Sequence, residues 1–206
     1  MYKMAELFDR ADSPRDYARR YAAYLADLLT SLDFEVVARI AEELDAAAQR
    51  GKAIYFIANG GSAAVASHWV NDLVAGAAVE GQPPFIAYSL ADNVESVTAI
   101  GNDSAFEDIF EMQLRGRVGA GDVVYAMSVS GNSENLVRAL EHARGAGATT
   151  IGICGIDGGR MKGRCDIVLH IPTTPDEYGP VEDIFSVLDH MIATYLAMRR
   201  GRALHH

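Results

Sequence analysis

The architecture of this 206-residue chain follows from residues 54–62, IYFIANGGS, where a short apolar run ends in a glycine-rich turn with a serine. Such a run next to turn residues is typical of a buried strand, and the serine then lies at a helix start. Residues 123–133, VVYAMSVSGNS, repeat the design with Ser128, Ser130 and Ser133. Each segment therefore predicts a buried strand that brings small hydroxyl side chains to a helix N-terminus.

Both turns have the composition of an anion-binding site. Glycines let backbone N–H groups approach a ligand closely, a helix N-terminus carries partial positive charge, and serine hydroxyls donate further hydrogen bonds. Neither turn contains G-x-x-x-x-G-K-[ST] or G-x-G-x-x-G, which argues against nucleotide-binding loops of those kinds. Ordinary helix capping by serine or asparagine explains one such turn equally well. The two turns together favour a sugar phosphate.

Composition narrows the class of protein. A chain of 206 residues, half of them hydrophobic, suits one α/β domain over residues 1–206. The net charge of -10, without a basic stripe, argues against a nucleic-acid partner. No apolar run approaches the roughly 20 residues that span a membrane, and no signal peptide precedes the domain. Cys154 and Cys165 form no C-x-x-C pair, so we expect a reduced, cytoplasmic protein.

Hydrophobic spacing predicts alternating helices and strands. Apolar residues at helical spacing on both sides of residues 31–33 predict a helical hairpin within residues 1–50, whose tyrosine stripe suits an oligomer bundle. The predicted strands cover residues 52–58, 85–89, 122–127, 149–154 and 166–171. The predicted later helices cover residues 62–75, 93–100, 105–116, 133–145 and 180–199. This alternation predicts an α/β fold with a doubly wound parallel sheet, which binds ligands beyond the carboxyl ends of its strands.

Two of the predicted helices carry residues that could share a metal ion. His68 and Asp72 lie one turn apart on one face of their helix. Glu182 and His190 are eight residues apart, about 80° out of phase at roughly 100° per residue, so both can face the same way. Nitrogen and oxygen ligands of this kind suit zinc or another divalent metal. A surface ion pair beside an unrelated histidine remains the alternative.

Four motifs, in order along the chain, resemble the SIS domain of bacterial phosphoheptose isomerases. They are Ala58–Ala64, Thr98–Asp103, Ser128–Ser133 and Thr150–Ile153, with His68 following the first. The resemblance implies a five-stranded parallel sheet of flavodoxin-like order. It also implies a homotetramer with a central helical bundle and active sites at subunit interfaces. The implied activity is aldose–ketose isomerisation of sedoheptulose 7-phosphate or a similar heptulose or octulose phosphate.

The resemblance assigns roles to matching positions. The substrate- and phosphate-binding residues it implies are Asn59, Gly60, Ser62, Asn102, Asp103, Ser128, Ser130, Ser133 and Glu182. The metal ligands it implies, for zinc or another divalent ion, are His68, Asp72, Glu182 and His190. Asp72 takes the position of the base and His190 that of the acid. Asp103 could equally cap the helix that follows it.

Several positions depart from the family pattern. Asp72 stands where the family has Glu, Glu182 where it has Gln, and Val129 where it has a hydroxyl residue. Gly76 and Gly179 stand where an active-site Arg and Asp are usual. These changes keep oxygen ligands at the implied metal site, but they remove two charged side chains that would face the sugar. The substrate is therefore expected to differ from the usual one.

The resemblance implies proton transfer between C1 and C2 through an enediol, with the metal polarising the carbonyl group. A metal-bound carboxylate is a weak base, so Asp72 serves both roles only if its coordination loosens, or if Glu182 or a water molecule takes one of them. The alternative is a non-catalytic SIS module that binds a phosphosugar or a protein partner. A lyase or an epimerase that begins with the same proton abstraction is a third hypothesis.

Overall fold

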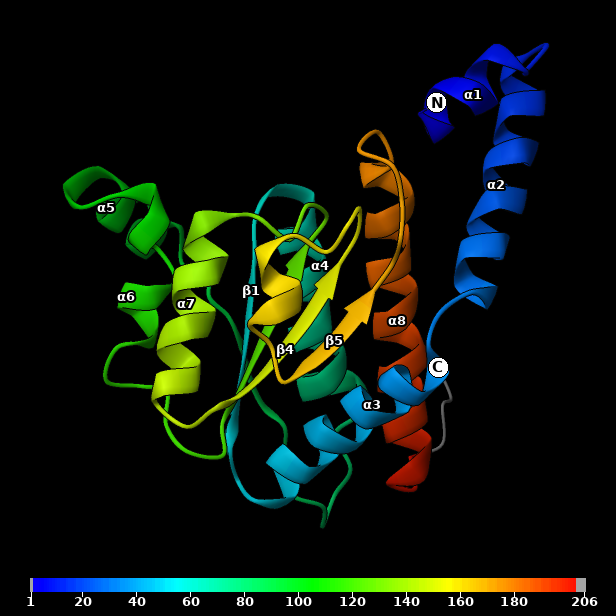
Figure 1. The fold of residues 1–206 in the computed structure, drawn as a ribbon. Helices are drawn as coiled ribbons and strands as arrows, with labels where there is room; N and C mark the ends of the chain where they lie inside the picture. The colour runs from blue at the N-terminus through cyan, green and yellow to red at the C-terminus, as the bar shows by residue number, and fades with distance from the viewer. Residues whose placement is uncertain (1, 203–206) are drawn as a thin grey trace.

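The computed structural model describes residues 2–202 and is built around a five-stranded parallel sheet (Figure 1). The strands are β1 (Ala53–Ala58), β2 (Ile86–Ser89), β3 (Val123–Ser128), β4 (Thr149–Cys154) and β5 (Ile167–His170). They lie in the order β2-β1-β3-β4-β5, with every neighbouring pair parallel. The predicted fold class, including the flavodoxin-like order, is confirmed.

Helices flank the sheet. They are α1 (Lys3–Asp9), α2 (Pro14–Thr30), α3 (Phe34–Gln49), α4 (Gly60–Asn71), α5 (Val94–Asp103), α6 (Glu111–Leu114), α7 (Glu134–Gly145) and α8 (Tyr178–Arg199). Short 3-10 turns occur at Phe106–Asp108 and Arg160–Gly163, and a π-helical turn at Asp72–Gly76 continues α4. The single helix predicted over residues 105–116 is therefore two short pieces. None of the helices in residues 2–202 has the length and hydrophobicity needed to cross a lipid bilayer.

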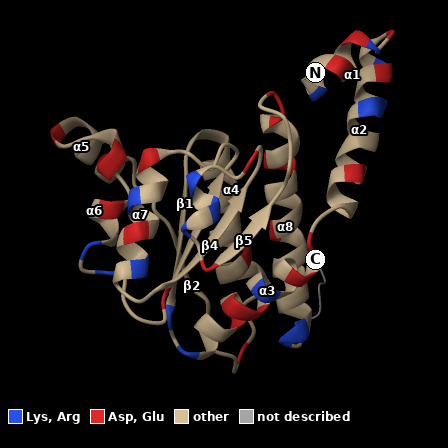
Figure 2. Cartoon of the chain, viewed as in Figure 1, with Lys and Arg blue, Asp and Glu red and all other residues tan. Residues whose placement is uncertain are grey.

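The strands are mainly apolar because both faces of the sheet are covered. Successive residues of β1 point to opposite sides, so Ile54 and Phe56 join one buried cluster while Tyr55 and Ile57 join the other. The first cluster lies under α3, α4 and α8, and the second under α6 and α7. In the described part of the chain, Lys and Arg are dispersed over these helices and not gathered in one stripe (Figure 2).

The two helices predicted before the first strand are both present. Ser13 caps α2 by accepting a hydrogen bond from the Asp16 N–H, and Asp33 caps α3 in the same way. The turn between them falls at residues 31–33, as predicted. However, α2 runs away from α3 and projects from the domain, so the predicted hairpin is open (Figure 1). Its direction is set by α8, because the hydroxyls of Tyr21 and Tyr24 donate to carboxylates at the start of that helix.

The far end of α8 is anchored by a buried arginine. The Arg200 guanidinium donates two hydrogen bonds to Asp45 Oδ1, at 2.9 and 2.7 Å, and a third to the carbonyl of Pro83. It also stacks on the ring of Phe85, with 3.7 Å between the guanidinium carbon and the ring centroid. This contact holds α8 against α3 and against the segment that leads into β2.

We expect Arg200→Met to lower the free energy of unfolding by about 2–4 kcal/mol, because it leaves the Asp45 carboxylate without its partner. Chemical denaturation measures this change. Arg115→Met is the matched control, since Arg115 pairs with Glu111 in solvent, and it should change stability far less. Equal effects of the two substitutions would contradict the structural role assigned to Arg200.

Candidate active site

A pocket of about 380 Å³ lies at the carboxyl ends of β1 and β3, between the two serine-rich turns. Its lining consists of Asn59, Gly60, Gly61, Ser62, Met127, Ser128, Val129, Ser130, Ser133, Leu136, Ile156, Pro175 and Glu182. Parallel strands place their carboxyl ends at one edge, which is why turns far apart in sequence meet here. Most of the predicted substrate-binding residues are thus brought together.

The first turn is shaped by two glycines. Gly60 has φ +55°, a conformation that favours glycine. A Cβ atom on Gly61 would lie only 2.5 Å from Glu182 Oε2, so this glycine lets α8 approach closely. As a result, the buried Ser62 hydroxyl donates to Glu182 Oε1 at 2.9 Å.

The second turn leaves hydroxyl groups available to a ligand. Ser133 is the N-cap residue of α7, yet its side chain makes no capping hydrogen bond. Ser128 Oγ accepts from the N–H of Gly131 at 3.1 Å, and Ser130 Oγ accepts from the N–H of Asn132 at 3.2 Å, which leaves both hydroxyl protons free to donate. Ordinary capping therefore does not account for Ser133 in this structure, and its hydroxyl is available to an anion at the start of α7.

Asn135, a residue that the sequence analysis missed, ties the two turns together. Asn59 Nδ2 donates to Asn135 Oδ1 at 3.0 Å, and Asn135 Nδ2 donates back to Asn59 Oδ1 at 2.8 Å. Asn135 is almost fully buried. A buried polar side chain in the first turn of a helix is a weak signal in sequence, because it resembles ordinary capping. Only the fold shows that its partner is Asn59.

The charge next to the second turn is balanced. Glu134 follows Ser133, and its carboxylate would repel a bound phosphate. Arg160 and Arg138 both pair with it, at 2.7 and 3.1 Å, and their hydrogen bonds lower the pKa of Glu134 below its usual range. Arg160 also donates to the carbonyl of Asn132 in the turn itself. Arg138 lies one turn further along α7, whereas Arg160 follows Glu134 by 26 residues and is brought to the turn by the fold.

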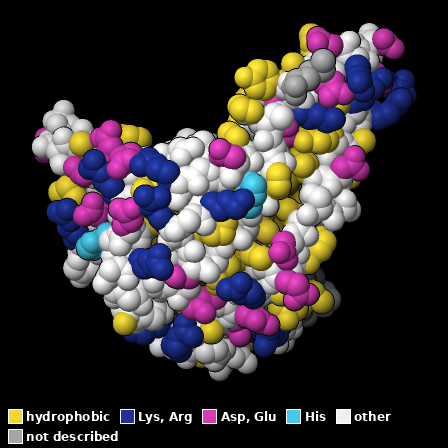
Figure 3. All heavy atoms as spheres, in the orientation of Figure 1, with side chains coloured by type: hydrophobic (Ala, Val, Ile, Leu, Met, Phe, Trp, Pro, Cys, Tyr) yellow, Lys and Arg dark blue, Asp and Glu magenta, His cyan; other side chains and the backbone are white. Residues whose placement is uncertain are grey.

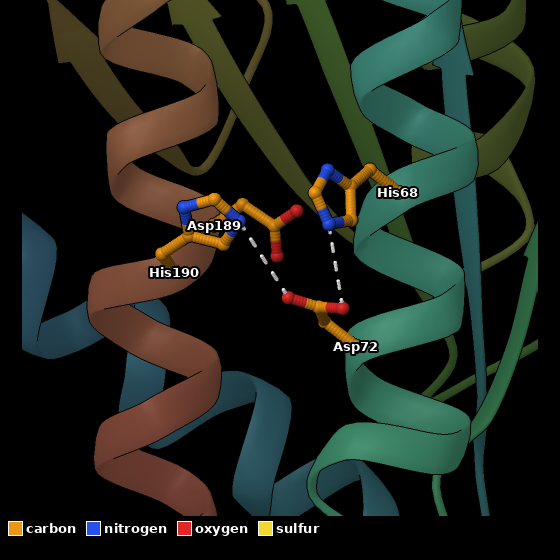
Figure 4. A group of neighbouring side chains, drawn as sticks. All are labelled: His68, Asp72, Asp189 and His190. Atoms are coloured by element: carbon orange, nitrogen blue, oxygen red, sulfur yellow. Dashed lines mark ion pairs between the residues drawn. The ribbon is translucent and has the colours of Figure 1, made fainter. Parts of the chain in front are cut away.

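A second group of polar residues lies further along α4 and α8 (Figure 4). His68 Nε2 lies 3.5 Å from Asp72 Oδ1, and His190 Nε2 lies 3.9 Å from Asp72 Oδ2. Each residue of the group formed by His68, Asp72, Asp189 and His190 offers a ligand atom, and these atoms lie within 4.8 Å of one another. Trp69 is buried against Phe56 and so turns the adjacent His68 outward.

Asp189 is the member of this group that the sequence analysis did not anticipate. It is fully buried, and neither of its carboxylate oxygens has a hydrogen-bond partner among the described residues. Burial, and then the charge of Asp72, raise the pKa of Asp189 to about 8. A sequence signal did exist, since Asp189 falls in the apolar stripe of α8 between Phe185 and Ile192. An unpartnered buried carboxylate next to two imidazoles fits a bound divalent cation.

Three predicted residues need separate description. Glu182 faces the same way as His190, but eight residues of helix separate them by about 12 Å along the axis, at 1.5 Å per residue. In this structure Glu182 lines the serine pocket, and it is not among the four residues whose ligand atoms lie within 4.8 Å of one another. Asn102 and Asp103 end α5, which follows the edge strand β2 and extends outward (Figure 1), so they do not reach the pocket of their own chain.

Gly76 and Gly179 occupy the two positions at which the family resemblance implies charged residues. Gly76 ends the π-helical turn, where an added Cβ atom would lie 3.6 Å from Asp72 Cβ. An added Cβ atom on Gly179 would lie 3.2 Å from the Tyr21 hydroxyl oxygen. Neither position contributes a charge to the site in this chain. π-Helical turns are common at functional sites, and this one begins at the Asp72 carboxylate itself.

Comparisons with known proteins identify the family of this chain. Residues 16–155 match the model of the SIS domain family. A phosphoheptose isomerase from Trichlorobacter lovleyi is 44% identical over 137 residues, which cover 66% of this chain and 69% of that protein. A probable phosphoheptose isomerase from Thermoplasma acidophilum is 32% identical over 179 residues, 87% of this chain and 97% of that protein.

A solved structure resembles the whole domain. A phosphoheptose isomerase from Neisseria gonorrhoeae superposes with a TM-score of 0.76 at 26% identity, covering 88% of this chain and 98% of that one. The chain therefore belongs to the SIS domain family, in which its similarity is to the phosphoheptose isomerases. It is a sugar-phosphate isomerase.

We expect Ser133→Ala to weaken phosphate-ester binding about tenfold, because one hydroxyl donor to the anion is lost, while the free energy of unfolding stays within about 0.5 kcal/mol. Calorimetric titration with inorganic phosphate and denaturant unfolding measure the two quantities. Ser13→Ala is the control, because Ser13 does cap its helix. It should cost about 1 kcal/mol of stability and leave binding unchanged. A large loss of stability in Ser133→Ala would show that this hydroxyl serves the helix.

Proposed function

We propose that this enzyme interconverts the aldose and ketose forms of a long-chain sugar phosphate, sedoheptulose 7-phosphate or a similar heptulose or octulose phosphate. The spacing of the two polar groups along α4 and α8 supports this length. Ser62 meets Glu182 near the start of both helices, and His68 meets His190 further along both. At 1.5 Å per residue, about 9–12 Å separates these levels. That distance suits an extended seven- or eight-carbon chain and exceeds a triose phosphate.

In this arrangement the phosphate group binds at the serine turns. Free hydroxyls of Ser128, Ser130 and Ser133 donate to its oxygens, together with N–H groups at the start of α7. Glu182 accepts from Ser62 through one carboxylate oxygen and presents the other to a sugar hydroxyl. The negative charge of Glu182 also disfavours a phosphate group bound next to it, so the phosphate group binds at the second turn.

The reactive end of the sugar then lies between His68 and His190. Asp72 takes the carbon-bound proton at C1 or C2, and His190 exchanges a proton with the neighbouring oxygen. Both histidine side chains are about half exposed, which suits contact with a substrate. A divalent metal, zinc among the candidates, would be held by His68, Asp72 and His190. When bound, it supplies polarisation of the carbonyl group and stabilisation of the developing negative charge.

Proton exchange tests this reaction. In deuterated water, NMR should show loss of the C1 or C2 proton signal from sedoheptulose 7-phosphate or an octulose phosphate as the two sugar forms interconvert. Binding of these esters without any exchange would instead support the non-catalytic SIS module, for which the missing charges at Gly76 and Gly179 are the favouring observation.

We expect His190→Ala to slow turnover by at least about 10²-fold, because proton transfer to oxygen loses its donor. Phosphate-ester binding should stay nearly intact, because the serine turns are unchanged. The measurement is the same exchange assay, run beside calorimetric titration with the ester. Parallel loss of binding and turnover would mean that His190 maintains the structure and takes no part in the reaction.

We also propose that the enzyme is a cytoplasmic homotetramer whose helices form a central bundle. An apolar groove of about 310 Å³ lies between α3 and α8, and Phe34 and Tyr195 on its rim are half exposed. Hydrophobic side chains also face the space between α2 and the sheet domain (Figure 3). Exposed apolar surface of this extent is typical of an interface, and a second copy of the chain is the occupant. The two free cysteines agree with a reducing compartment.

Tyr195→Glu should shift the protein toward smaller assemblies, because it places a charge in the apolar groove. Light scattering coupled to size exclusion reports the mass. Met112→Glu serves as the control, since Met112 is also exposed but lies on α6, across the sheet from the groove, and it should leave the mass unchanged. A monomeric unmutated protein would contradict the proposed assembly.

A further inference from the structure

The polar group on α4 and α8 contains two carboxyl groups, although both of its histidines pair with Asp72 alone. Asp72 and Asp189 both turn toward the space between the helices, and His68 and His190 close it from either side (Figure 4). Two carboxylates and two neutral imidazoles balance the charge of one divalent cation. A set that also included Glu182 would carry a third negative charge.

Among residues 2–202, none donates a hydrogen bond to the Asp189 carboxyl group. Asp189 has 0% of its surface exposed, and neither carboxylate oxygen is hydrogen-bonded to a described residue. The Tyr125 hydroxyl and the Trp69 indole N–H are buried and unpartnered as well, so neither serves as its donor. The nearby charge is that of Asp72, which is repulsive. A buried ionised carboxylate without a partner is strongly disfavoured, and coordination of a cation removes the penalty.

The geometry of α8 explains how Asp189 reaches the group. Residues 189 and 190 point about 100° apart on a helix, so Asp189 enters from the buried side and His190 from the exposed side. Meanwhile, Glu182 is engaged two turns away, where Ser62 donates to it and the absence of a side chain at Gly61 makes room for it. The residue at the family's ligand position is therefore committed to the substrate pocket.

We propose that Asp189, and not Glu182, completes the cation ligand set of this chain, and that the bound cation stabilises the fold by joining α4 to α8. This inference rests on the proposed metal-assisted function. It makes the cation a structural link as well as a source of chemistry, since one ion would join ligand atoms from both helices.

The test is titration of the chelator-treated full chain with zinc alone, followed by calorimetry. Asp189→Asn should weaken zinc binding at least about tenfold, and Asp189→Leu, which offers no ligand atom, should weaken it further. Glu182→Gln, on the same helix, should leave the affinity essentially unchanged. A His68→Ala/His190→Ala double variant measures background binding, including that of the terminal His205 and His206, which lie outside the described residues.

Thermal unfolding gives a second readout that does not depend on turnover. Zinc should raise the melting temperature of the unmutated protein and of Glu182→Gln. Without zinc, Asp189→Asn and Asp189→Leu should melt at or above the temperature of the unmutated protein, because a buried carboxyl group without a hydrogen-bond partner has been removed. Zinc should no longer raise the melting temperature of these variants. Folded variants thereby separate loss of a ligand from loss of structure.

The possible results are distinguishable. Zinc binding that survives in both Asp189 variants, or that is lost in Glu182→Gln, would overturn the inference alone. Failure of the unmutated protein to bind zinc would overturn it together with the metal-assisted part of the proposed function. Zinc binding that depends on Asp189, in a protein that exchanges no sugar proton, would support the inference and overturn the proposed reaction.

Discussion

The fold depends on one constraint: a parallel sheet must be covered on both faces. Because Ile54 and Phe56 require one cover and Tyr55 and Ile57 another, helices are needed on either side of β1. Each helix returns the chain so that the next strand runs in the same direction. The carboxyl ends of all the strands therefore lie at one edge of the sheet. The serine turns after β1 and β3 meet there although they are far apart in the sequence.

The pairing of α4 with α8 extends this constraint into the site. Both helices pack on the same face of the sheet and run in the same direction, so the level of Ser62 matches that of Glu182 and the level of His68 matches that of His190. The serine pocket and the His–Asp group are consequently spaced by helical rise and not by a flexible loop. The buried contact between Arg200 and Asp45 anchors α8 at its far end.

Two glycines and two acidic residues determine where charge lies at the site of this chain. The positions at Gly76 and Gly179 contribute no charge, Glu182 joins the serine pocket, and Asp189 brings a carboxylate into the apolar stripe of α8. Carboxyl groups thus lie both in the serine pocket and at the interface of α4 with α8. Under the proposed ligand set, such a centre would depend on a bound cation for its stability more than a site made of exposed ligands would.

Local periodicity was enough to predict the strands, the main helices and the serine turns, because burial on both sides of a strand and on one side of a helix leaves a repeating apolar pattern. The resemblance to a known family added the roles of Ser128, His68 and His190. Neither the periodicity nor the resemblance predicted the contacts between distant segments. These are the pairing of Asn59 with Asn135, the separation of Glu182 from His190 along the helix axis, and the position of Asp189 beside the histidines. Sequence spacing reports the direction in which a side chain points, whereas the height at which two packed helices meet depends on how their whole surfaces fit together.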